Sequence, residues 1–112
     1  MIYSLAKINE MADGDQEFIQ SIIQVFLDEV PLDLKELKQA VDSGDFEQIY
    51  KLSHKIKPNV DLLGMESTRV LALEMEQMGR NNSDLEGIRE RFPQFARDVE
   101  QVISELQNDF KM

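Results

Sequence analysis

The spacing of the apolar residues constrains the fold of this chain more than any other feature. Apolar side chains recur every three or four residues along almost the whole sequence, which is the period of an amphipathic helix. No stretch alternates between apolar and polar residues for long, and no glycine-rich loop follows a strand-like run. The pattern predicts an all-α fold, and the short segments between helices favour an antiparallel, up-down-up-down four-helix bundle with a short N-terminal helix.

Residues that cap, interrupt or end helices divide the chain into predicted elements. Asp15 is expected to cap a helix that ends near Val30, because Pro31 suits the first turn of a following helix. Ser83 and Glu86 form an S-x-x-E capping box that should open the last helix. The predicted helices cover residues 16–30, 31–41, 46–63, 66–78 and 85–110, with further boundaries at Gly44, Asp45 and Gly64.

The length and charge of the chain exclude several classes of function. At 112 residues we expect one domain, spanning residues 1–112. The 22 acidic residues outnumber the 12 lysines and arginines, so the broad basic surface that nucleic-acid binding needs is absent. The same charge disfavours anionic membranes, and no apolar run approaches the ~20 residues of a membrane-spanning helix. The absence of cysteine and of a signal-like N-terminus favours a cytoplasmic location.

One position stands out against this acidic background, because the only histidine of the chain, His54, has three lysines around it. Lys51, Lys55 and Lys57 lie within three residues of it, and residues 48–60 contain no acid. On a helical wheel His54 lies roughly 150° from the centre of the apolar stripe, so we expect it to face solvent. The stripe consists of Ile49, Leu52, Ile56, Val60 and Leu63.

A lone exposed histidine is most often inert, and a run of charge is usually a solvated surface. Here, however, the pattern fits a phosphate. A neutral imidazole can attack phosphorus, and nearby ammonium groups would keep it neutral and offset the charge of a phosphoryl group. A metal site is not expected, since a single histidine without cysteine leaves only carboxylates as further ligands. No ATP-binding motif is present, so another protein would have to bring the phosphate.

The segment "SHKIKPNVDLLG" resembles the signature of histidine-containing phosphotransfer (HPt) domains. That signature has a histidine, a branched aliphatic residue, a lysine and a later glycine, which match His54, Ile56, Lys57 and Gly64. Upstream, "SGDFEQIYKLSH" looks like the usual approach to the histidine helix, and "EFIQSIIQVFLDEVPLDLKEL" resembles the first two bundle helices. The resemblance covers nearly the whole chain.

The resemblance implies a phosphorelay intermediate. His54 would accept a phosphoryl group from the aspartate of one receiver domain and pass it to another, so the chain would be a phosphocarrier and not an enzyme with its own ATP site. Lys57, together with Lys55, would stabilise the phosphoryl charge. Glu76 lies 22 residues after His54, where family members place a residue that orients the imidazole. The chain would need no cofactor, because the receiver supplies Mg²⁺. Its partners would be response-regulator receivers or a hybrid histidine kinase, and it would act as a monomer.

One position departs from the family pattern, because Pro58 stands where glycine is usual. Glycine lets a receiver approach closely, whereas proline removes an amide and should bend the helix. We expect Pro58 to lie on the exposed side with His54 and to contact the partner, as we do for Lys51, Asp61 and Arg80.

The helix predicted over residues 16–30 is apolar around more of its circumference than one packing face needs, which is about 100°. Residues Phe18, Ile22, Val25 and Phe26 are expected to face the core. Either other parts of the chain cover the apolar remainder, or it forms a docking patch for a receiver beside the histidine. The residues of that patch are Ile19, Ile23 and Leu27.

Three functions remain open from the sequence. The first is the phosphocarrier just described. The second is an adaptor of the same fold that docks receivers without carrying phosphate. The third is a purely structural bundle whose surface histidine has no role.

Overall fold

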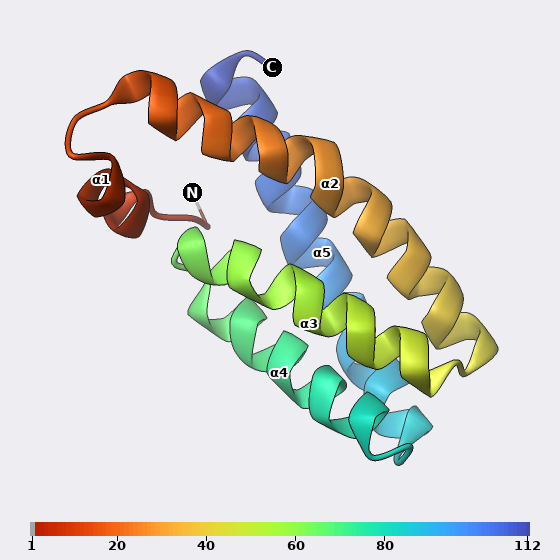
Figure 1. The fold of residues 1–112 in the computed structure, drawn as a ribbon. Coiled ribbons are helices and arrows are strands. Elements are labelled where there is room, and N and C mark those ends of the chain that lie inside the picture. The colour runs from red at the N-terminus through yellow and green to blue at the C-terminus, as the bar shows by residue number, and fades with distance from the viewer. Residues whose placement is uncertain (1) are drawn as a thin grey trace.

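In the computed structural model, residues 2–112 are described, and they form α-helices and no β-strand. The helices are α1 (Ala6–Ala12), α2 (Gln16–Ser43), α3 (Phe46–Leu62), α4 (Glu66–Arg80) and α5 (Leu85–Phe110). Turns of a few residues join them (Figure 1). The all-helical class predicted from the apolar period is therefore confirmed.

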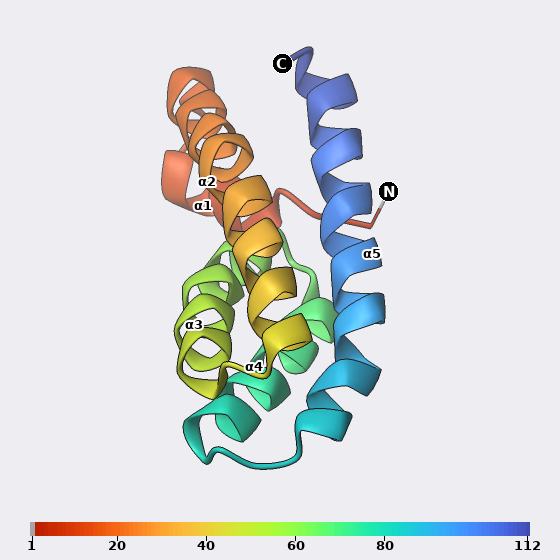
Figure 2. The same cartoon turned by 90° about the vertical axis from the view of Figure 1, so that its right-hand side faces the viewer.

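The four long helices pack into a bundle around one apolar core. α3 packs against α4 and α2, while α5 packs against α2 and α4. α2 and α5 extend beyond α3 and α4 at one end, where α1 lies near the start of α2 (Figures 1 and 2). The bundle measures 44 × 22 × 20 Å. The largest fully buried side chains come from all five helices and include Ile8, Ile23, Leu37, Ile49, Ile56, Met75, Ile88 and Phe95.

The predicted break at Pro31 is wrong, because α2 continues through this residue to Ser43. Proline inside a helix removes one hydrogen bond and costs about 3 kcal/mol. Burial on both sides of Pro31 offsets that cost, since each fully buried aliphatic side chain stabilises by about 1.5–3 kcal/mol. Val30 directly precedes the proline and Leu34 lies three residues after it, and both are buried. The two predicted helices are thus a single helix.

Most other predicted boundaries are confirmed, but the last helix begins differently. Gly44 ends α2 with a left-handed φ of 73°, and the side chain of Asp45 caps α3 by accepting from Gln48 N at 3.2 Å. α5 is capped not by Ser83 but by Asp84, whose carboxylate accepts from Gly87 N at 2.9 Å. A carboxylate one residue later thus replaces the predicted capping box, since Asp and Ser are both good N-caps. α4 also continues two residues beyond its predicted end.

The N-terminal segment is held by hydrogen bonds at the end of the bundle where α3 and α5 end. Ser4 N donates to Leu63 O at 2.7 Å, and the buried Tyr3 donates its hydroxyl to Asp109 Oδ2 at 2.5 Å. These bonds connect α5 to the turn that follows α3. Burial, the hydrogen bond to Asp109 and the negative charge of Asp109 raise the pKa of Tyr3 from 10.0 to about 12.

This raised pKa predicts a specific alkaline sensitivity. Tyr3 stabilises the fold fully below pH 10, where it is protonated in both states, and this contribution is lost as the pH rises towards 12. We expect Tyr3→Phe to be less stable than wild type at neutral pH by about 1 kcal/mol. Its disadvantage should shrink or reverse between pH 10 and 12. Chemical unfolding of both proteins across this range measures the difference, and parallel pH profiles would contradict the assignment.

Candidate functional site

His54 lies on the exposed face of α3, as the helical wheel predicted. Its side chain is 64% exposed, while Ile49, Ile56 and Val60 on the opposite side of the helix are fully buried. Burial of this apolar stripe against α2 and α4 fixes the rotation of α3 about its axis. The stripe therefore determines that the imidazole points outwards.

Glu76 on α4 is brought next to His54. His54 Nδ1 lies 3.3 Å from Glu76 Oε1, and the Glu76 side chain is only 13% exposed. Nδ1 is thus the ring nitrogen that faces the carboxylate, although the contact lacks hydrogen-bond geometry. Nε2 is the ring nitrogen that does not face Glu76, on an imidazole that is mostly exposed.

Lys57 shares this carboxylate. Its Nζ lies 2.8 Å from the same Oε1 atom, and its side chain is 24% exposed. The lysine offsets the charge of a carboxylate that is largely removed from solvent, which is the condition under which such a carboxylate is tolerated. His54, Lys57 and Glu76 therefore form one charged cluster across α3 and α4.

Two further residues support this cluster, and neither is predicted from the sequence to belong to it. The Tyr50 ring lies one turn before His54, with its centroid 6.2 Å from that of the imidazole. Gly79 lies buried inside α4, one residue beyond the end predicted for this helix. A Cβ atom at Gly79 would lie 2.8 Å from Tyr50 N and 3.0 Å from Phe46 O. The backbones of α3 and α4 therefore touch one turn from the histidine.

Lys55 does not join the cluster, although it was expected to stabilise phosphoryl charge beside Lys57. Its Nζ donates to Asp33 Oδ1 on α2 at 3.0 Å, and Asp33 is buried. The hydrogen bond to Asp33 and its negative charge raise the pKa of Lys55. Adjacent residues on a helix do not face each other, which explains why Lys55 points to α2 while His54 lies beside α4. Lys55 therefore connects α2 to α3.

The other residues expected to contact a partner occupy varied places. Lys51 and Pro58 lie exposed on the His54 side of α3, where Lys51 Nζ pairs with Glu47 Oε1 at 2.9 Å. Asp61 accepts from Lys7 Nζ of α1 at 2.8 Å. Arg80 is exposed in the last turn of α4. The structure thus groups Lys51 and Pro58 with the histidine.

The predicted docking patch is wrong at two of its three positions. Ile19 is 3% exposed and Ile23 is fully buried, while Leu27 is half-buried. Because α2 does not break at Pro31, the longest apolar stripe on it sets its rotation. That stripe continues through both halves of the helix as Ile19, Ile23, Phe26, Val30, Leu34 and Leu37. The patch residues belong to it and are covered by the core.

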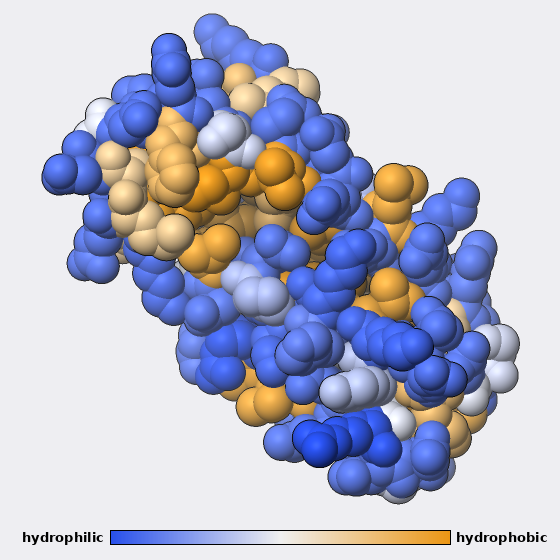
Figure 3. Space-filling view, in the orientation of Figure 1, coloured by the Kyte–Doolittle hydropathy of each residue, from blue (hydrophilic) through white to orange (hydrophobic). Residues whose placement is uncertain are grey.

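The same rotation exposes a different apolar stripe on α2. Phe18 and Val25, predicted to face the core, are 37% and 51% exposed. Val25 and the half-buried Ile22 line a groove of about 260 Å³ between α2 and α3, together with Asn59 and Leu62 of α3. Apolar atoms gather on this part of the surface, where α1, the start of α2 and the end of α3 meet (Figure 3). We call Phe18, Ile22, Val25 and Leu62 the α2–α3 apolar surface.

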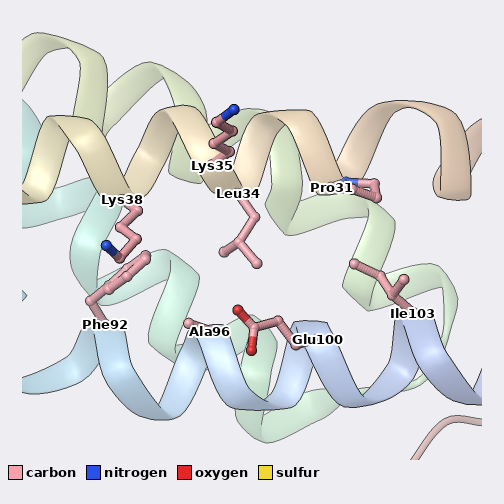
Figure 4. Close-up of a pocket in the computed structure, with 8 residues that line it drawn as sticks. All are labelled: Pro31, Leu34, Lys35, Lys38, Phe92, Ala96, Glu100 and Ile103. Atoms are coloured by element: carbon pink, nitrogen blue, oxygen red, sulfur yellow. The ribbon is translucent and has the colours of Figure 1, made fainter.

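A cavity of about 330 Å³ lies between α2 and α5, away from the cluster of His54, Lys57 and Glu76. Leu34 of α2 and Glu100 of α5 point into it, and Lys38 lies close to Phe92 at one end (Figure 4). Neither His54 nor Glu76 lines it.

Among residues 2–112, no group of three or more His, Cys, Asp or Glu side chains is arranged to hold a metal ion. Within the same range, no helix has the length and apolarity that crossing a membrane requires.

Comparison with known families identifies the class of this protein. A model of the Hpt domain matches residues 21–109, so the chain belongs to the Hpt domain family. Hpt domains are phosphocarrier modules that work with receiver domains and histidine kinases in two-component signalling, and they are not enzymes in themselves. Comparison with curated proteins and with solved structures gave no match.

Proposed function

We propose that this protein is a phosphorelay intermediate that carries a phosphoryl group on His54 between two receiver domains. The observation that carries the proposal is the exposed imidazole whose Nδ1 lies 3.3 Å from Glu76 Oε1. In this proposal the four long helices form an antiparallel, up-down-up-down bundle and the protein acts as a monomer. Its partners are response-regulator receivers, free or within a hybrid histidine kinase.

In the proposed transfer, the Nε2 lone pair of His54 attacks the phosphorus of the receiver's aspartyl phosphate. The N–P bond forms as the bond between phosphorus and the aspartate oxygen breaks, and the aspartate leaves as a carboxylate. The proton on Nδ1 stays in place, and Glu76 offsets the positive charge that develops on the ring. In the second transfer a receiver aspartate attacks the same phosphorus and Nε2 leaves. The receiver holds the Mg²⁺ ion, so the carrier itself binds no metal.

Lys57 has a supporting part in this proposal. It neutralises Glu76 before transfer, so that the carboxylate does not repel the incoming phosphoryl group. Lys51 lies one turn before His54 on the exposed side, where it is paired with Glu47. The charge of each lysine is thus balanced by a neighbouring carboxylate in the free protein.

Replacement of Glu76 tests the orientation of the ring. We expect Glu76→Gln to slow phosphorylation of His54 about tenfold, because the variant removes the negative charge that offsets the charge developing on the ring, and tenfold in rate corresponds to about 1.4 kcal/mol. Binding of the receiver should change little, since Glu76 is mostly buried. Quenched-flow assays at a saturating concentration of receiver measure the rate of phosphoryl transfer. Glu74→Gln, on the same helix but paired with Arg91, is the matched control. Equal rates in both variants would remove Glu76 from the mechanism.

The α2–α3 apolar surface is the proposed docking site for the receiver. It includes the end of α3, the helix that carries His54, and small interfaces are sufficient for transient signalling complexes. We expect Val25→Asp to weaken receiver binding at least tenfold with little change in stability, because Val25 is 51% exposed. Val70→Asp on α4 introduces the same charge at another exposed valine and should bind normally. Isothermal titration against one receiver compares them, and equal losses would place the docking site elsewhere.

The proposed function is tested by mixing the purified protein with several receiver domains that carry labelled aspartyl phosphate. We expect label to move to this protein and then to a second, unlabelled receiver. The adduct should be labile in acid and stable in alkali, as a phosphohistidine is. If receivers bind but no label moves, the protein is a docking adaptor of the same fold. If no receiver binds, the bundle is purely structural.

A further inference from the structure

Pro58 lies on the exposed face of α3, one turn beyond His54. In an α-helix the carbonyl of each residue accepts from the amide four residues later. Proline has no amide hydrogen, so residue 58 cannot donate to the His54 carbonyl. α3 nevertheless continues unbroken from Phe46 to Leu62. The lost hydrogen bond therefore falls at the reactive residue, within an otherwise regular helix.

Side chains do not replace the missing donor. The next carbonyl along the helix, that of Lys55, accepts from Asn59 Nδ2 at 3.3 Å. No comparable side-chain donor reaches the His54 carbonyl from anywhere in residues 2–112. In helix geometry this carbonyl points towards position 58, and both His54 and Pro58 are exposed. In the free protein we therefore expect solvent to supply its donor.

A partner changes that situation when it reaches the imidazole. To place a phosphoryl group on Nε2 it must lie over this face, and it then removes the water from the His54 carbonyl. A buried carbonyl without a donor is unfavourable, whereas a partner that supplies an N–H or O–H group keeps it satisfied. An amide hydrogen at position 58 would bond the His54 carbonyl within the helix. Partners with and without a donor group would then no longer differ at this oxygen.

We propose that Pro58 makes the His54 carbonyl a determinant of partner specificity. The protein selects receivers that present a backbone N–H or a side-chain donor to this oxygen and discriminates against receivers that cover it without one. This inference rests on the proposed phosphotransfer function and names the chemistry required of the partner. The difference between the two kinds of receiver is about five- to tenfold in affinity, the size of one hydrogen bond.

The single histidine makes the carbonyl directly observable. Histidine labelled with a heavy isotope at its carbonyl carbon gives one separate amide band in the infrared spectrum, that of residue 54. The probe is an unlabelled receiver held in its active form with beryllofluoride and Mg²⁺. We expect the band to narrow on binding and to keep the frequency of a hydrogen-bonded carbonyl. A shift to the higher frequency of an unbonded carbonyl would overturn the inference.

Two variants at position 58 separate the amide from the ring. Pro58→Ala restores the amide and should reduce affinity for the selected receivers about five- to tenfold. Lactic acid at the same position has the methyl group of alanine but an ester in place of the amide, and it should recover the affinity. Circular dichroism checks that both remain helical.

Equal affinities of the two variants would overturn the inference. Label transfer with no carbonyl effect would reject the inference and leave the proposed function intact. Failure of every receiver to bind the wild-type protein would reject the proposed function, and the inference with it.

Discussion

His54→Gln is expected to take up no phosphoryl label from any receiver that labels the wild-type protein. Glutamine has a similar length, but its amide nitrogen has no free lone pair with which to attack phosphorus. No second histidine can replace the lost one, because the chain has only this imidazole. The α2–α3 apolar surface is unchanged in the variant, so its affinity for receivers should stay within about twofold of the wild-type value. Label transfer and affinity are measured with the same receiver.

The pair of measurements separates three outcomes. Loss of label with retained affinity supports the carrier. Retained label on His54→Gln would show that another side chain accepts the phosphoryl group and would contradict the assignment. Loss of both label and affinity would mean that the substitution disturbs α3, which circular dichroism would reveal. Glu90→Gln, on the exposed side of α5, controls for a surface change to glutamine and should behave as wild type.

Gly79→Ala is expected to destabilise the protein by about 2 kcal/mol, which corresponds to roughly 8 °C in Tm. The same substitution inside an ordinary helix stabilises by about 0.5–1 kcal/mol, so the sign is opposite to the usual one. The reason is the contact with α3, because the new methyl group would lie 2.8 Å from Tyr50 N. That neighbour is backbone and cannot rotate away, so the two helices must separate.

Separation of α3 and α4 has a second expected result. Glu76 lies one turn before Gly79, so movement of α4 draws its carboxylate away from His54. We therefore expect Gly79→Ala to slow phosphorylation as well as to lower stability. Gln77→Ala, at an exposed position of α4, changes neither contact and is the matched control. Thermal unfolding and transfer rates are measured for both. Wild-type stability in Gly79→Ala would show that the two backbones are not in close contact.

The all-helical class follows from the spacing of the apolar residues. The rotation of α2 about its axis does not follow from that spacing when only part of the helix is considered. Within residues 16–30, two apolar stripes are almost equally good, and the predicted stop at Pro31 hid the continuation that decides between them. Ile19 and Ile23 align with Leu34 and Leu37 only when α2 is one helix. Local proline preference and long-range burial disagreed at this point, and burial determined the structure.

The site was predictable in part. The position of His54 on the polar side of its helix, and of Glu76 on the next helix, could be expected from the sequence. The partner of Lys55 could not, because the sequence does not show how α2 and α3 are placed against each other, and Asp33 lies on α2. Gly79 is followed by polar residues typical of a loop, and only the packed structure shows that the glycine serves a close helix contact. The signal available in the sequence was that Gly79 fits the three-to-four-residue spacing of the buried positions in the helix before it.

Glu76 Oε1 lies close to both His54 Nδ1 and Lys57 Nζ, and this has a consequence for the direction of flow through the proposed carrier. The two nitrogens share the negative charge of one carboxylate. In the proposed carrier the ring would gain charge on phosphorylation, so the carboxylate would interact more with the ring and less with the lysine, and the reverse when the group leaves. The phosphorylated and free forms would thus exchange one electrostatic contact for another. We expect neither form to be a deep energy minimum, so that such a carrier can be filled from either side and emptied to either side.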